Sequence, residues 1–139
     1  MVKKTNILFI CKHNRFRSKI AEAVFNKYNK NLKYKAKSAG IIIGHYPLNK
    51  TQVSAAKEFG IKLTGKPKGL DYNLIKWQNI IVVVADDVPP SIFKRIQKKH
   101  KKKLIIWKIH DIDSNNKKEM RRIIKLIENR VKGFVRNLR

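Results

Sequence analysis

The chain has 139 residues, of which 34 are Lys or Arg and 9 are Asp or Glu, so its formal net charge is +25. This length fits one domain, and a hydrophobic content of 42% is enough for a packed core. The single cysteine excludes a disulfide framework, a cysteine-based zinc cluster and a thiol relay within the chain. No apolar run reaches membrane-spanning length, and the N-terminal run is too short for a signal peptide. We therefore expect one domain over residues 1–139 in the reducing cytoplasm, without membrane contact.

The net positive charge indicates which partners the protein could bind. The electrostatic field of so many cations attracts polyanions and speeds the approach of anionic substrates, so nucleic acid, acidic proteins and phosphorylated ligands are all candidates. The densest run of cations covers residues 98–103. Lysines are spread along the whole chain, however, and a generally solvated basic surface explains them equally well. Nucleic acid is therefore a possible partner but not the favoured one.

The first half of the chain alternates apolar runs with amphipathic stretches. Residues 6–10 form an apolar run that predicts a buried strand, and residues 18–28 predict a helix with one apolar face. Residues 32–37 alternate apolar side chains with lysines, which predicts an edge strand that the Ser-Ala-Gly sequence at 38–40 ends. A second helix is expected over residues 51–59, where Gly60 ends it.

The second half continues this alternation. A turn is expected at residues 66–69, around Pro67, and a short helix at 72–77. The β-branched run at 80–84 predicts a fully buried strand, and Pro89 and Pro90 can start a helix that ends at 99. A strand at 104–107 and a long helix at 116–138 complete the chain. The apolar stripe of this last helix is typical of a core-facing surface.

This order of elements indicates an α/β fold. We expect a doubly wound, flavodoxin-like sheet of about four parallel strands with helices on both faces. Sheets of this kind bind ligands outside the carboxyl ends of their strands. Cys11 follows the first strand, Asp86 and Asp87 follow the strand at 80–84, and Asp111 follows the strand at 104–107. These four side chains can therefore converge on one crevice.

Cys11 opens a segment that runs from the first strand into a helix. Arg17 follows it six residues later, and Ser18 comes next. In such a turn the backbone N–H groups and the positive end of the helix form an anion cradle. Arg17 can hold two oxygens of a tetrahedral oxyanion, and the positive field favours the nucleophilic thiolate. The alternative is that Cys11 is only a small buried hydrophobic residue after a strand.

With Cys11, Arg17, Ser18 and three acids that follow strands, the sequence resembles the low-molecular-weight protein-tyrosine phosphatase and thioredoxin-type arsenate reductase superfamily. The likeness covers nearly the whole chain, and the segment at 11–18 looks like the superfamily's C-x5-R-S loop. Within it, His13-Asn14 is particularly similar to the arsenate-reductase-like branch, as is Ala-Glu-Ala at 21–23. The Ser-Ala-Gly turn at 38–40, the stretch from 47 to 68 and the Trp-x-x-x-Asp element at 107–111 also match.

The resemblance implies a division of roles within the loop. Cys11 would attack phosphorus and form a phosphocysteine, and Arg17 would hold the equatorial oxygens. Ser18 would hydrogen-bond the thiolate, and Asn14 would hold the loop's shape, through Ser38. The remaining substrate-binding positions of the loop are Lys12, His13, Arg15 and Phe16. No metal or other cofactor is implied.

Further implied roles belong to acids beyond the loop. Asp111 would protonate the leaving oxygen and then activate water, and Asp86 resembles an aspartate that braces the site near the arginine. Other interpretations remain open: Asp86 and Asp87 could cap the following helix, and Asp111 could be a turn residue. Ser38 could only end a strand. His13 could pack the loop, and Trp107 is expected to be a core aromatic.

The chain also departs from the superfamily pattern. His13 stands where the phosphatases usually have Gly, and Arg15 and Phe16 are unusual at their positions. Ile112 replaces the proline that usually follows the general acid, and no tyrosine comes after it. Asp113 is therefore a rival acid, although the spacing from Trp107 favours Asp111. Two residues of another segment, His45 and Tyr46, are alternatives for lining the mouth.

The sequence is compatible with three functions. The first is a phosphatase that hydrolyses phosphotyrosine or other phosphomonoesters, with a phosphorylated protein or a small phosphomonoester as its partner. The second is arsenate reduction, since arsenate is a phosphate analogue; Cys11 alone would need an external thiol or redoxin. The third is a non-catalytic basic module that binds polyanions. A phosphocysteine carrier of sugar transport shares the cysteine after a strand, but Arg17 and Ser18 argue against it.

Overall fold

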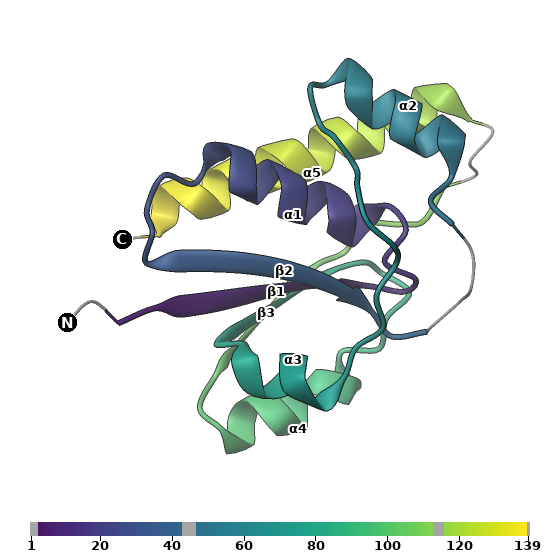
Figure 1. Cartoon of the computed structure of the whole chain (residues 1–139). Coiled ribbons are helices and arrows are strands. Elements are labelled where there is room, and N and C mark those ends of the chain that lie inside the picture. Colours follow the sequence, from purple (N-terminus) through teal and green to yellow (C-terminus); the bar gives the residue numbers. More distant parts are fainter. Residues whose placement is uncertain (1–2, 43–46, 113–115, 139) are drawn as a thin grey trace.

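A parallel sheet organises the molecule. The structure, a computed structural model, describes residues 3–42, 47–112 and 116–138. The strands are β1 (Thr5–Cys11), β2 (Tyr34–Gly40), β3 (Ile80–Val84) and β4 (Lys103–Trp107). They pair in parallel in the order β2-β1-β3-β4. The predicted four-stranded parallel sheet is therefore confirmed, and its carboxyl ends lie at one edge (Figure 1).

Helices cover both faces of this sheet (Figure 1). One face carries α1 (Arg17–Tyr28), α2 (Lys50–Glu58) and α5 (Lys117–Asn137). The other carries α3 (Tyr72–Trp77) and α4 (Ser91–Lys99). The doubly wound arrangement is thus confirmed, and every helix lies within a few residues of its expected bounds.

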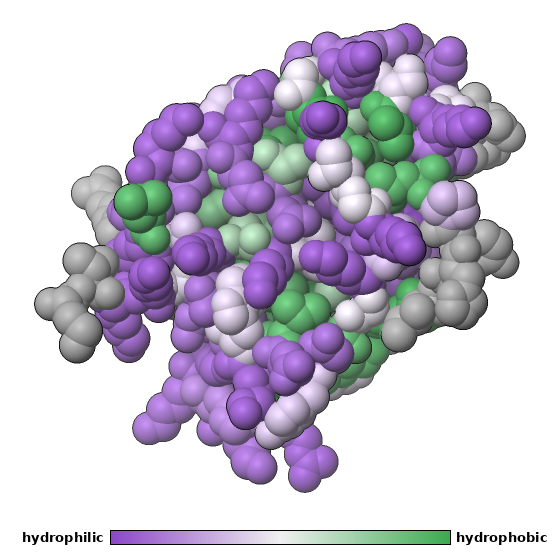
Figure 2. Space-filling view, viewed as in Figure 1, coloured by the Kyte–Doolittle hydropathy of each residue, from purple (hydrophilic) through white to green (hydrophobic). Residues whose placement is uncertain are grey.

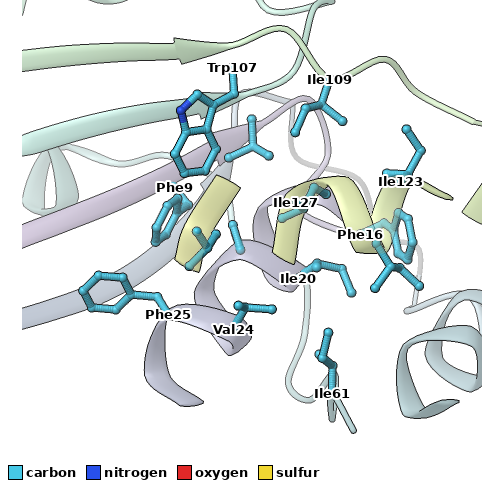
Figure 3. Packing of buried hydrophobic residues seen from close by; sticks show 14 of the residues in the cluster. Phe9, Phe16, Ile20, Val24, Phe25, Ile61, Trp107, Ile109, Ile123 and Ile127 are labelled. Atoms are coloured by element: carbon cyan, nitrogen blue, oxygen red, sulfur yellow. The ribbon is translucent and has the colours of Figure 1, made fainter. Parts of the chain in front are cut away.

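The strands can be covered on both faces because their side chains alternate in direction. In β1, Ile7 and Phe9 join the core beneath α1 and α5, whereas Leu8 and Ile10 join the core beneath α3 and α4. All four side chains are fully buried. Figure 3 shows the first of these cores, where residues of β1, α1 and α5 meet. The apolar run before Cys11 therefore anchors the carboxyl end of β1 from both sides.

The apolar stripe of α5 packs as expected. Met120, Ile123, Ile124, Ile127 and Val131 are fully buried, and the later members of the stripe are partly buried against the same core.

Trp107, at the end of β4, belongs to this core too. Its ring lies 6.0 Å from the ring of Phe134, edge-on, and 6.1 Å from that of Phe9. Trp107 is thus the core aromatic that the sequence indicates, and it places the following segment at the carboxyl edge of the sheet.

Two local expectations need correction. β2 begins at Tyr34 and runs to Gly40, instead of covering residues 32–37. Leu32 is 88% exposed, because a turn closed by hydrogen bonds to Asn31 precedes the strand. The stretch at 66–69 is also more than a turn, since Gly69 pairs in parallel with Gly40. This pairing brings the 61–70 segment against the carboxyl end of β2.

The surface follows from the composition. Hydrophilic side chains cover most of the face shown in Figure 2, with apolar groups scattered between them. Among the residues that the structure describes, no helix is long and apolar enough to cross a membrane.

Candidate active site

The start of α1 differs from the starts of three other helices. α2, α3 and α5 begin after Asn49, Asp71 and Asn116, whose side chains accept a hydrogen bond from the backbone of the first turn. α1 begins after Phe16, which makes no such bond, and its first turn holds no acidic residue. The Phe16 side chain therefore does not cap the first N–H groups of α1. These groups lie at the helix end that favours an anion.

Cys11 lies at the base of this turn, as the last residue of β1. The residue is 2% exposed, and its Sγ lies 2.9 Å from Ser18 Oγ. The backbone N–H of Asn14 donates to the same sulfur over 3.3 Å. The sulfur thus sits among hydrogen-bond donors, which favour its negatively charged form.

Asn14 holds the loop from inside. It is fully buried and has a φ of 54°, in the left-handed region that Asn tolerates better than most residues. Its Nδ2 donates to Ser18 Oγ over 2.7 Å and to Ser38 Oγ over 3.0 Å. Its Oδ1 accepts from the backbone N–H of Lys68 over 2.9 Å, which fixes the orientation of the amide. Ser18 Oγ therefore accepts from Asn14, and its own proton is free to be donated to Cys11.

Gly40 makes the loop's position possible. It is the register partner of Cys11 in the pairing of β1 with β2. A Cβ at this position would lie 2.7 Å from the carbonyl carbon of His13 and 2.8 Å from the backbone nitrogen of Asn14. Only glycine allows the loop backbone to pass this closely over the end of β2.

Arg17 is held by two other strand ends. Its Nη1 donates to the carbonyl oxygen of Ile109 over 2.9 Å and lies 3.0 Å from Asp87 Oδ1. Its Nη2 donates to Asp87 Oδ2 over 3.2 Å. Arg17 is 3% exposed. Burial alone would raise the pKa of Asp87, but the hydrogen bond and charge of Arg17 outweigh it, and the pKa falls below its ordinary value.

This geometry corrects the expectation that Asp86 lies beside the arginine. The paired carboxylate is that of Asp87, whereas Asp86 is exposed. The cause is the backbone N–H of Asp86, which donates to the carbonyl oxygen of Ile109 over 3.0 Å and leaves the next residue to face Arg17. Neither acid caps α4, because its N-cap is Pro90, which makes no side-chain bond.

A pocket of about 160 Å³ opens above the sulfur. It is lined by Cys11, His13, Arg15, Phe16, Arg17, Asn49, Gln52, Asp111 and Ile112. The structure thus brings Asp111 to the same pocket as Cys11 and Arg17, and its carboxyl group is exposed there. Asn49 and Gln52 were not anticipated; the Asn cap before α2 is the signal that could have located them, since Asn49 Oδ1 accepts from the Gln52 N–H.

Several expected site residues lie elsewhere. Asn14, Ser18 and Ser38 are buried behind the loop rather than in the pocket, and the Lys12 side chain does not line it. His45, Tyr46 and Asp113 fall outside the described residues.

Two residues of the loop fasten it to its surroundings. The Arg15 guanidinium donates to the carbonyl oxygen of Pro47 over 3.2 and 3.0 Å, and Phe16 is 4% exposed in the core. These contacts hold the loop in place beside the pocket that it lines.

Known proteins resemble this chain over most of its length. Residues 6–139 match the family described as low molecular weight phosphotyrosine protein phosphatase. An arsenate reductase of Staphylococcus aureus is 35% identical over 104 residues, which cover 72% of this chain and 76% of that protein. A solved low molecular weight protein tyrosine phosphatase from T. tengcongensis is 21% identical, with a TM-score of 0.82 over 97% of this chain and all of that one. An arginine phosphatase from Geobacillus stearothermophilus is 19% identical, with a TM-score of 0.81 over 95% and 91% of the two chains. The last two likenesses show the fold.

Proposed function

Because the chain belongs to the low molecular weight phosphotyrosine protein phosphatase family, we propose that it hydrolyses phosphomonoesters through a phosphocysteine on Cys11. A phosphotyrosine-bearing protein or a small phosphomonoester is the substrate class. The observation that carries the proposal is the shared pocket: Cys11, Arg17 and Asp111 line it together, and the Cys11 sulfur accepts a hydrogen bond from the backbone N–H of Asn14.

In the first step the thiolate of Cys11 attacks phosphorus, forming a phosphorus–sulfur bond as the bond to the ester oxygen breaks. Asp111 gives its proton to the leaving oxygen. The equatorial oxygens are held by N–H groups at the start of α1 and by the Arg17 fork, whose hydrogen bonds strengthen as charge develops. The carboxylate of Asp87 keeps that fork in place.

In the second step water attacks the phosphocysteine. Asp111, now a carboxylate, takes a proton from this water, and the phosphorus–sulfur bond breaks. Inorganic phosphate leaves and Cys11 returns as a thiolate. Ser18 supports the departing sulfur by donating its proton to it, since Asn14 already donates to the serine oxygen.

The setting of the reaction is part of the proposal. A thiolate nucleophile survives best in a reducing compartment, which supports action in the cytoplasm. The charge of +25 favours the approach of phosphorylated ligands, and free phosphate and similar oxyanions fit the same cradle.

Arsenate reduction is the second candidate, favoured by the relative from Staphylococcus aureus. Arsenate would bind in the cradle as a phosphate analogue. Reduction needs two electrons, and Cys11 is the only cysteine of the chain. An external thiol would have to attack the sulfur of a Cys11–arsenic adduct, release arsenite and leave a mixed disulfide, which a second external thiol then reduces.

The test compares both activities in purified protein. We expect the wild type to hydrolyse 4-nitrophenyl phosphate and Cys11→Ser to lose turnover, with acid quenching of the wild type trapping a phosphorylated cysteine. Parallel incubation with arsenate, with and without glutathione or thioredoxin, measures arsenite. Hydrolysis that survives in Cys11→Ser would reject the mechanism, and arsenite formation without phosphatase turnover would favour the second candidate.

A further inference from the structure

Lys19 is a buried cation for which the reaction above has no use. It follows Ser18 directly in the first turn of α1 and is 6% exposed. Its Nζ donates to the carbonyl oxygen of Thr64 over 3.2 Å. Burying an ammonium group is costly unless nearby groups compensate for the lost water. Lys19 does not line the pocket above Cys11. The groups around its ammonium therefore bear on what it does.

Those surroundings form a hollow beside α1. It has a volume of about 650 Å³ and is lined by residues that include Lys19, Glu22, Lys27, Lys62, Thr64 and Lys68. Among the described residues that line it, Glu22 is the only acid, and it lies one helical turn after Lys19. The pKa of Lys19 is lowered chiefly by burial and also by Lys68, whereas Glu22 and Cys11 act to raise it. The side chains of Lys19 and Glu22 therefore line one hollow together.

Glu22 is connected to the sulfur by a directed chain of hydrogen bonds. Ser38 donates its hydroxyl proton to Glu22 Oε1 over 2.6 Å, so its oxygen can accept from Asn14 Nδ2. The second proton of Asn14 Nδ2 goes to Ser18, which lies against Cys11. The carboxylate thus anchors the chain, but its negative charge by itself works against a negative sulfur.

We propose that Lys19 is a positioning residue for the catalytic thiolate: its buried ammonium offsets the charge of Glu22, which anchors Ser38 and the hydrogen-bond chain to Cys11. The proposal rests on the proposed function, because it concerns the thiolate of that reaction. Among the described residues, the other charged or titratable groups near the sulfur are Lys12, next to it in the loop, and His13, Arg15, Arg17, Asp87 and Asp111 on the pocket side. The substitutions below leave all of them in place.

The single cysteine allows a direct test. Iodoacetamide, which is neutral, alkylates cysteine as the thiolate, so the rate at which Cys11 itself is alkylated between pH 4 and 9, followed by mass spectrometry, reports its thiolate fraction without any turnover. We expect Lys19→Met to slow alkylation at acidic pH by about three- to tenfold, and Lys19→Arg to restore most of it. Lys27→Met is the matched control: it removes one exposed cation from the same hollow and should react like the wild type.

Removing the charge of Glu22 should have the opposite effect on alkylation. Glu22→Gln keeps an acceptor for Ser38 but removes the charge, so alkylation at acidic pH should become faster than in the wild type. In Lys19→Met/Glu22→Gln both charges are gone, and the rate should return toward the wild-type value. Circular dichroism melting of every variant separates a loss of folding from a loss of thiolate.

The proposal is overturned if Lys19→Met alkylates at the wild-type rate, or if Lys27→Met slows it equally. Should Lys19→Met fail to fold, the proposal depends on Glu22→Gln, and an unchanged or slower rate there overturns it. Absence of phosphatase turnover in the wild type would reject the proposed function while leaving the alkylation result readable.

Discussion

Arg17 and Asp87 are 70 residues apart in the sequence, and the Arg17 Nη1 lies 3.0 Å from Asp87 Oδ1. The pair joins the loop after β1 to the loop after β3, and the Ile109 carbonyl oxygen after β4 accepts a further hydrogen bond from the guanidinium. A freely rotating arginine would lose side-chain entropy each time it bound an oxyanion. Because Asp87 and Ile109 already hold the guanidinium, we infer that this side-chain entropy is lost when the protein folds rather than when it binds an oxyanion.

The first prediction concerns this pair. Asp87→Asn keeps the shape of the side chain but removes the charge that fixes Arg17, and we expect kcat/KM for an aryl phosphate to fall about 10- to 100-fold. Asp86→Asn, one residue earlier and exposed, should change it little. Steady-state kinetics of the two variants check this, and a larger loss in Asp86→Asn would contradict the assignment.

The second prediction concerns the stability of the fold at acidic pH. The pKa of Asp87 is lowered in the folded protein, so the folded state binds fewer protons at this group than the unfolded state near the ordinary value of 3.8. The pair therefore stabilises the fold fully above that value, and this contribution is lost as the pH falls through the lowered pKa. Urea melts between pH 2.5 and 6 should show a smaller loss of stability on acidification in Asp87→Asn than in the wild type. Equal pH dependence in both proteins would argue against it.

The third prediction uses two glycines. Gly40→Ala places a Cβ within 2.7–2.9 Å of the backbone of the loop that follows β1, so the loop must shift. We expect a loss of about 1–3 kcal/mol of unfolding free energy together with a loss of turnover. Gly133→Ala lies in α5, where the new Cβ would lie 3.8 Å from a guanidinium nitrogen of Arg136, and it should stabilise the protein by about 0.5–1 kcal/mol. Chemical denaturation measures both, and full activity in Gly40→Ala would refute the tight fit.

The fourth prediction separates the two candidate acids. A poor leaving group depends on protonation, so Asp111→Asn should lower kcat for phenyl phosphate about 10²- to 10⁴-fold and for 4-nitrophenyl phosphate much less. Asp113→Asn serves as the comparison. A selective loss for phenyl phosphate in Asp113→Asn, with Asp111→Asn unaffected, would move the role of general acid to Asp113.

Local pattern was enough to predict most of the elements. The β-branched run of β3, the apolar stripe of α5 and the strand-to-helix turn after Cys11 each carry their signal within a few neighbouring residues. Strand alternation then placed Cys11 and Asp111 at one edge, because parallel strands end on the same side. The edge strand β2 was misplaced by two residues at its start, since its boundary depends on the turn at Asn31 rather than on the lysine alternation.

Residue types and the strand pattern were enough to identify the chemical groups and the edge of the sheet where they gather: a thiol, an arginine fork and carboxylates after successive strands. Which partners these groups take depends on how the chain folds. Asp87 rather than Asp86 faces Arg17 because a backbone hydrogen bond to Ile109 turns the loop, and Lys19 is buried because the segment with Thr64 closes over it. These contacts join residues tens of positions apart, and their geometry follows from packing, which no local pattern of residue types encodes.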